Sequence, residues 1–173
     1  MVKDTYDLRL TQNAEVKNVA VDCTGENTSA DQLCVLRVNA PAGTAVTVYV
    51  PNTKNEVTSG TVAGNQWVTL YVVSDTYDVF LKQNAEEKTL EDVVITSDTD
   101  LSQLCTLQVK DTAGAAIKVY TEGSTTDLVT SGTVAGNGWV TLYVVRDTYD
   151  VFDGTTTKSS VDCSGATQTV TFP

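Results

Sequence analysis

Short runs of alternating apolar and polar residues follow one another along the whole chain. In Ala45–Val50, for example, Val46, Val48 and Val50 fall on one face. A period of two is typical of a β-strand with one buried face, and no run has the period of a convincing amphipathic helix. The runs and the turn residues between them predict strands over Tyr6–Leu10, Val16–Asp22, Leu33–Val38, Ala45–Val50, Glu56–Val62, Trp67–Val73, Thr76–Leu81, Leu90–Thr96, Thr106–Lys110, Ala116–Tyr120, Leu128–Val134, Trp139–Val145, Thr148–Phe152, Ser159–Cys163 and Thr167–Phe172.

The strand Trp67–Val73 differs from the others because both of its faces carry bulky side chains. Val68, Leu70 and Val72 point one way, and the aromatic residues Trp67 and Tyr71 point the other. This pattern predicts a central strand. The turn residues Ala63–Gln66 predict that it forms a hairpin with the strand before it.

One stretch of the chain is repeated almost without change. Val57–Phe80 returns as Val129–Phe152 with differences only at Gln66/Gly138 and Ser74/Arg146. A period of about seventy residues is too long for a solenoid and suits a small domain, so we expect tandem domains. A shorter echo, Asp4–Leu8, matches the end of this stretch. The sequence therefore predicts an incomplete half-repeat over 1–32 and two sandwich repeats over 33–103 and 104–173.

The number of predicted strands differs between the repeats. The second has seven, whereas the first has six and would share Leu104–Lys110 as its seventh. The two N-terminal strands lack a front half altogether. Because unpaired strands are an aggregation hazard, we expect a neighbouring protomer to complete them by donating strands. The alternative is that the N-terminal pair folds back onto the first repeat as extra edge strands.

Composition narrows the function classes. The net charge is -11, which argues against nucleic acid and anionic membrane surfaces as partners, and no apolar run is long enough for membrane insertion. No apolar core follows Met1, so no secretory signal is expected there. The chain contains no histidine, the commonest general base and metal ligand. We therefore expect neither an enzyme nor a cofactor.

Four cysteines, Cys23, Cys34, Cys105 and Cys163, lack the spacing of a zinc site. Cys105 and Cys163 are expected at the same end of one sandwich, and Cys23 and Cys34 flank a short connection. We predict disulfides within these two pairs, with bonds between protomers as the alternative. Disulfides favour an extracellular or cell-surface location. The sequon at Asn27 is a further candidate for modification outside the cell.

Two other sets of residues are candidate binding sites. Asp75, Asp78, Asp147 and Asp150 have oxygen ligands suited to calcium, but no calcium-loop motif surrounds them, and strand-end aspartates are the simpler interpretation. Trp67, Tyr71, Trp139 and Tyr143 occupy the same positions in both repeats. They are either a platform for stacking on polysaccharide or packing residues.

Turn residues and strand spacing in the second repeat resemble a known family. The segments concerned are Val109–Ala116, Val119-Tyr120, Asn137–Val140 and Thr148–Val151. Together they resemble the carboxypeptidase-regulatory-like, or prealbumin-like, sandwich and the related collagen-adhesin B-type repeat. The glycine usual before Thr-Tyr is replaced by Asp75 and Asp147. The resemblance implies an all-β fold of tandem, antiparallel, immunoglobulin-like sandwiches.

These observations together predict a non-catalytic structural subunit. We expect it to build an extracellular filament, sheath or adhesive stalk from copies of itself. The alternative is an accessory module that binds carbohydrate or protein within a larger secreted enzyme or adhesin.

Overall fold

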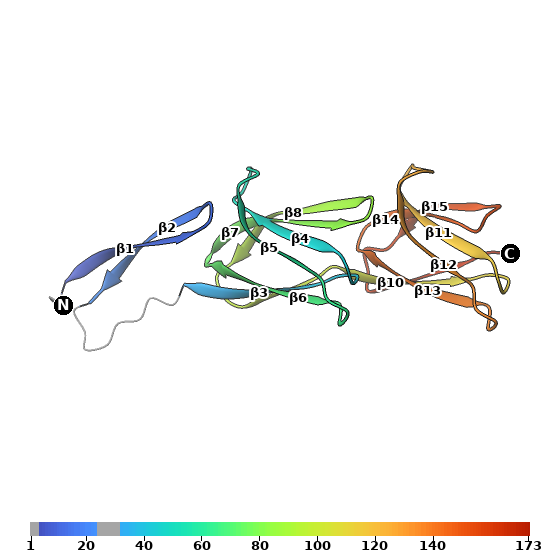
Figure 1. Cartoon of the computed structure of the whole chain (residues 1–173), viewed down its shortest axis with the longest axis horizontal. Coiled ribbons are helices and arrows are strands. Elements are labelled where there is room, and N and C mark those ends of the chain that lie inside the picture. The colour runs from blue at the N-terminus through green and yellow to red at the C-terminus, as the bar shows by residue number, and fades with distance from the viewer. Residues whose placement is uncertain (1–3, 24–31) are drawn as a thin grey trace.

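The computed structural model describes residues 4–23 and 32–173. These residues form strands, turns and loops, arranged as three bodies along one axis (Figure 1). A two-stranded N-terminal hairpin comes first, followed by unit 1 (β3–β9) and unit 2 (β10–β16). None of the described residues belongs to a helix long and apolar enough to cross a bilayer.

Sixteen strands make up the described part of the chain. They are β1 (Thr5–Gln12), β2 (Glu15–Asp22), β3 (Leu33–Asn39), β4 (Ala45–Tyr49), β5 (Glu56–Thr61), β6 (Trp67–Val73), β7 (Asp75–Gln83), β8 (Glu86–Ile95), β9 (Thr99–Ser102), β10 (Leu104–Lys110), β11 (Ala116–Thr121), β12 (Leu128–Thr133), β13 (Trp139–Val145), β14 (Thr148–Phe152), β15 (Thr157–Asp162) and β16 (Thr167–Thr171).

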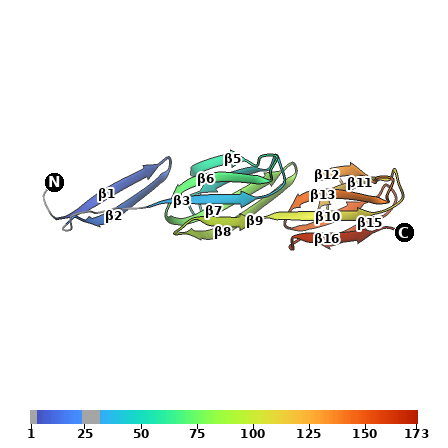
Figure 2. The ribbon, with the colours of Figure 1, turned by 90° about the horizontal axis from the view of Figure 1, so that it is seen from below.

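Units 1 and 2 have the same sheet topology. Each packs a three-stranded sheet, ordered β6-β3-β9 or β13-β10-β16, against a four-stranded sheet, ordered β5-β4-β7-β8 or β12-β11-β14-β15 (Figure 2). The predicted all-β sandwich fold is confirmed. In each unit the last strand, β9 or β16, pairs in parallel with the first strand, β3 or β10. The other strand pairs are antiparallel.

The alternating apolar residues fill the space between the two sheets. In unit 1, Leu36 and Val38 of β3 meet Val46 and Val48 of β4, and all four are fully buried. Cys105, Leu107, Val109, Ile117 and Val119 hold the corresponding positions in unit 2. Burial of the Val, Leu and Ile side chains, each worth about 1.5 to 3 kcal/mol, provides the main driving force for folding of each unit.

The connection between β5 and β6 crosses from one sheet to the other. The predicted hairpin is therefore wrong, because β5 pairs with β4 and β6 pairs with β3. The two strands approach closely: a Cβ on Gly60 would lie 2.9 Å from Val68 Cγ2. The strand β6 is also an edge strand rather than a central one, because it stands first in the sheet order β6-β3-β9. Its bulky aromatic side chains point outward to solvent.

Unit 1 has its own seventh strand. The short strand β9, Thr99–Ser102, pairs with β3, so Leu104–Lys110 belongs to unit 2 alone as β10. The expectation of six strands and a shared seventh is wrong. Only four residues form β9, and their alternation is too short to stand out in the sequence.

The N-terminal hairpin forms a separate two-stranded sheet. It adds no edge strand to unit 1, contrary to the alternative considered above. Instead the hairpin points along the long axis, and its turn reaches unit 1 (Figure 1).

Candidate inter-unit joint

The same kind of contact joins successive bodies at two places. At joint 1, the turn of the N-terminal hairpin meets unit 1, and at joint 2, the β7–β8 turn of unit 1 meets unit 2. Both turns carry the motif Gln-Asn-Ala-Glu followed two residues later by lysine: Gln12 to Lys17 at joint 1 and Gln83 to Lys88 at joint 2. These residues make the candidate functional site.

At joint 2, the side chain of Gln83 binds the backbone of the edge strand β13. Its Nε2 donates to the Tyr143 carbonyl at 2.9 Å, and its Oε1 accepts from the Val145 N–H at 3.1 Å. An edge strand exposes a row of unpaired backbone groups, and the glutamine amide satisfies two of them. The result is a two-point clamp on β13 formed by a side chain that is itself buried.

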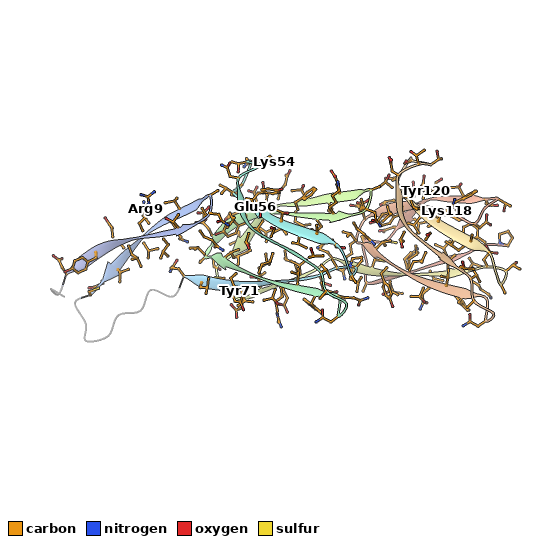
Figure 3. All side chains as sticks on the ribbon, viewed as in Figure 1. Arg9, Lys54, Glu56, Tyr71, Lys118 and Tyr120 are labelled. Atoms are coloured by element: carbon orange, nitrogen blue, oxygen red, sulfur yellow. The ribbon has the colours of Figure 1, made fainter. Side chains whose placement is uncertain are left out.

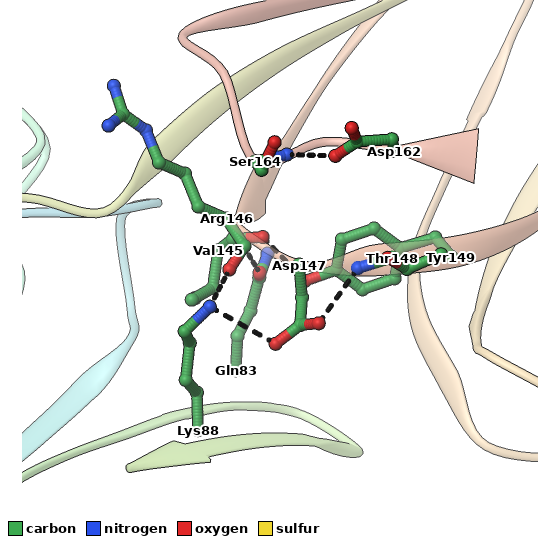
Figure 4. A network of polar contacts seen from close by, with 9 residues as sticks. All are labelled: Gln83, Lys88, Val145, Arg146, Asp147, Thr148, Tyr149, Asp162 and Ser164. Carbon is green, nitrogen blue, oxygen red and sulfur yellow. Dashed lines mark hydrogen bonds and ion pairs between the residues drawn. The ribbon is translucent and has the colours of Figure 1, made fainter. Parts of the chain in front are cut away.

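Asn84 and Lys88 extend the contact on either side of the clamp. Asn84 has a φ of 53°, which asparagine tolerates better than most residues, and its Nδ2 donates to the Val129 carbonyl at 2.7 Å. Lys88 Nζ donates to the Arg146 carbonyl and lies 3.2 Å from Asp147 Oδ2 (Figure 4). Three side chains of one short segment thus hold two strands of the next unit, β12 and β13, and the connection from β13 to β14.

Apolar packing reinforces joint 2. Val145, at the end of β13, is fully buried and belongs to the hydrophobic cluster of unit 1. Its carbonyl accepts a 2.6 Å hydrogen bond from the Tyr149 hydroxyl. Burial raises the pKa of Tyr149 above its usual value, so the hydroxyl stays a donor. The end of β13 is therefore shared between the cores of both units.

Glu86 places a carboxyl group inside the joint. Glu86 is only 6% exposed. Burial, followed by the nearby Asp147, raises the pKa of Glu86 to about 7, and Lys88 partly opposes this. The carboxyl is consequently poised to change its charge near neutral pH.

Joint 1 repeats this chemistry with other residues. Gln12 Nε2 donates to the Tyr71 carbonyl at 2.6 Å, and Gln12 Oε1 accepts from the Val73 N–H at 3.2 Å. Lys17 donates to the Ser74 carbonyl and lies 3.5 Å from Asp75 Oδ2. Burial also raises the pKa of Glu15, with Asp75 adding to the effect. The polar contacts of the two joints therefore correspond residue by residue.

The hairpin β14–β15 of unit 2 has a different turn. Asp153 and Gly154 stand there, and Asp153 Oδ1 accepts from the Thr155 and Thr156 N–H groups at 2.7 and 2.6 Å. An Asp-Gly pair is typical of a hairpin turn. It closes the turn on itself and offers no glutamine to a neighbour.

All four cysteines are in the thiol form in this structure. Cys105 and Cys163 lie together in the core of unit 2, and a hydrogen bond between their side chains lowers the pKa of Cys105 and raises that of Cys163. The structure does not bring Cys23 and Cys34 together. Cys23 ends the hairpin away from its docked turn, roughly 30 Å along β2 at the usual rise per residue, whereas Cys34 is buried in unit 1 beside Val72.

The calcium candidates bind backbone N–H groups. Asp78 accepts from Asn52 and Asp92 at 2.8 and 3.0 Å, and Asp150 accepts from Gly123 and Ser160 at 3.1 and 2.9 Å. Each of the two buttresses a β-bulge in the following strand. Asp75 and Asp147 take part in the joints. Within 4–23 and 32–173, no three acidic or cysteine side chains converge as a metal site.

The aromatic candidates lie on the outer face of the three-stranded sheets. Figure 3 shows Tyr71 on the outside of β6, and Tyr143 has the same place on β13. The Arg37 Cζ atom lies 5.8 Å from the ring centre of Trp67, and the Lys110 Nζ atom lies 5.9 Å from the ring centre of Trp139. These aromatic side chains are outside the core. The sequon at Asn27 lies outside the described residues.

The sequence patterns do not predict the joint. Gln12–Glu15 has the same residues as Gln83–Glu86, and this match by itself indicates only duplication. The available signal was the motif Gln-Asn-Ala-Glu, which is the same in both hairpin turns, although the turn conformation itself needs only the asparagine. Retention of glutamine, glutamate and lysine together indicates contacts beyond the hairpin.

Comparisons with known proteins find only weak likeness to solved structures. No family model and no curated protein matches the chain. Among solved structures, the Bacillus anthracis TIE protein is similar over 91% of this chain and 38% of its own, with 12% identity and a TM-score of 0.33. A streptococcal ancillary pilin is similar over 99% and 75%, with 8% identity and a TM-score of 0.31. TM-scores this low carry no argument about function.

Proposed function

We propose that this chain is a non-catalytic structural subunit of an extracellular filament, sheath or adhesive stalk. The observation that carries the proposal is the joint: the same set of side chains fixes successive bodies twice. Flexible linkers would leave tandem domains free to reorient. A clamp of paired hydrogen bonds, repeated at both joints, instead makes a stiff spacer, as a stalk requires.

Each unit has one acceptor surface for a joint. The acceptor on unit 1 binds the N-terminal hairpin turn through backbone groups of Tyr71, Val73 and Ser74, and the acceptor on unit 2 binds the β7–β8 turn in the same way. Both acceptors are filled within the chain, so in this proposal the joints fix the spacing of bodies inside a protomer, and an oxidised Cys105–Cys163 pair staples unit 2 outside the cell.

Electron microscopy of native cell-surface material tests the proposal. Antibodies against unit 2 are expected to label filaments or stalks at regular intervals. Native protein that stays monodisperse in light scattering and is found only inside cells would contradict it.

A second candidate is a carbohydrate-binding module. It is favoured by the outward aromatic pairs Trp67 with Tyr71 and Trp139 with Tyr143, because aromatic faces stack on sugar rings. A glycan array read with the parent chain and Trp139→Ala separates the two. Binding that is lost in Trp139→Ala favours the module. Absence of glycan binding by the parent chain favours the spacer.

A further inference from the structure

The N-terminal hairpin carries an apolar face that is buried in its two counterparts. Leu8 on β1 is 41% exposed, whereas the equivalent Val79 and Val151 are fully buried. Leu10 is half-buried, and its equivalent Leu81 is fully buried. A strand face of this kind normally packs on a second sheet.

The hairpin matches the closing hairpin of a sandwich at both of its ends. At its turn it has the joint motif of β7–β8. At its open end the Cys23 N–H donates to the Asp4 carbonyl at 2.9 Å, just as Cys163 donates to the Asp147 carbonyl at 2.8 Å. Asp4 Oδ1 accepts from the Thr5 N–H at 2.8 Å, as Asp147 Oδ1 does from Thr148 at 2.9 Å.

The chain itself shows what covers such a hairpin. In unit 1, β7 pairs with β4, and the buried face of β7 shares a core with Leu36 of β3 and Leu70 of β6. The front half of a unit, its first four strands, therefore supplies both a pairing edge and a facing sheet. In unit 2, the front half also supplies Cys105, whose thiol meets Cys163.

We propose that the N-terminal hairpin is the closing hairpin of a further sandwich, and that its partner is the front half of a like unit. That partner has four strands equivalent to β10–β13 and a cysteine at the position of Cys105. The proposal rests on the proposed structural role and names the partner through which the array continues. It replaces strand donation to an open unit, because units 1 and 2 are each closed by their own hairpins.

Cys23 gives the partner a covalent signature. It aligns with Cys163, so its thiol faces the cysteine that opens the first strand of the partner. In an oxidising medium, a bond forms between the two sulfur atoms. The two thiols lose two protons and two electrons to a small-molecule disulfide, which is reduced to two thiols.

An extended chain tests the proposal directly. A second copy of residues 104–146 is inserted between Lys3 and Asp4 of the full chain, so that the new junction of Arg146 with Asp4 copies the natural one with Asp147. We expect the β1 amides to exchange with solvent on the order of 100-fold more slowly than in the parent, because an isolated hairpin is marginally stable. Under oxidising conditions, peptide mapping should join Cys23 to the added copy of Cys105.

Two control variants make the outcome decisive. Leu8→Asp in the extended chain should abolish the gain in protection, since it puts a charge into the new core. A second extended chain, with residues 147–162 in place of 4–22, shows whether the added strands fold on a hairpin known to close them. If this control folds while the β1 amides of the first chain keep their parental exchange rate, the proposal is overturned.

Self-association of the parent gives a separate result. A Cys23-to-Cys23 dimer of the parent, with β1 protected in it, would show that two hairpins cover each other and would also overturn the proposal. Neither result depends on filaments seen by microscopy. Failure of the structural role and failure of this partner assignment are therefore distinguishable.

Discussion

Gln66 and Gly138 occupy the same turn position in two nearly identical stretches. Their φ angles are 67° and 80°, in the left-handed region where a side chain is strained and glycine is not. The repeat thus contains its own control for the cost of a side chain at this position.

Exchanging these two residues should shift stability in opposite directions. We expect Gln66→Gly to stabilise unit 1 by about 0.5 to 1 kcal/mol and Gly138→Gln to destabilise unit 2 by a similar amount. Urea unfolding of both variants against the parent measures the difference. A shift of the same sign in both would contradict the assignment of strain to this position.

Glu86 should make joint 2 sensitive to pH. Its folded pKa of about 7 lies above its ordinary value of 4.5, so its contribution to stability is complete below about pH 4.5 and is lost as pH rises through about 7. Glu86→Gln should therefore stabilise the protein at pH 8, on the order of 1 to 3 kcal/mol, and change little at pH 4.

Unfolding free energies at a series of pH values test this expectation. Glu91→Gln, at an exposed position of the same strand β8, is the matched control. Equal pH dependence in the Glu86 variant and the parent would show that the carboxyl is not buried in the joint.

At the scale of elements, the joint turn acts as a docking device that the hairpin itself does not need. Gln83→Ala should leave the buried Val145 N–H without its acceptor, at a cost of about 1 to 3 kcal/mol to the joint. Hydrogen exchange at the Val145 amide is the direct reading, and we expect it to accelerate. Gln108→Ala, at an exposed position on β10, is the control. If the Val145 amide of Gln83→Ala stayed fully protected from hydrogen exchange, the proposed role of Gln83 as a clamp would be wrong.

The cysteine pair of unit 2 is a second element-scale device. Oxidised, it would tie the first strand of the unit, β10, to the end of β15, and we expect it to add roughly 2 to 4 kcal/mol. Reductant should lower the stability of the oxidised parent by this amount and leave a Cys105→Ser/Cys163→Ser variant unchanged. The pairing would be contradicted if reductant left the stability of the parent unchanged and both thiols could be titrated after the protein was unfolded in oxidising buffer.

Local signals explain which elements were predictable. Alternation in β4 or β11 is a pattern between neighbours in the sequence, and it predicts the strands of the sandwich. The partners of β5 and β6 depend on which sheet each strand joins, and the close approach of the two strands at Gly60 is a contact between sheets that alternation does not encode. The joint depends on residues about sixty apart, such as Gln83 and Tyr143, and only the repetition of its motif was visible.

At the scale of the whole molecule, three bodies lie in line and two equivalent joints connect them (Figure 1). The acidic surface, with a net charge of -11, opposes random association and leaves specific contacts to determine assembly. Because joint 2 has a buried hydrogen bond and a shared core residue, Val145, we expect units 1 and 2 to tumble as one body in solution.

Residual dipolar couplings of backbone amides in the full chain test this rigidity most directly. The account predicts that couplings from units 1 and 2 fit a single alignment tensor, with the relative orientation seen in this structure, and that Gln83→Ala reduces the agreement. Two tensors of clearly different magnitude in the parent chain would show that the units move independently, and would contradict the stiff spacer on which the proposed function depends.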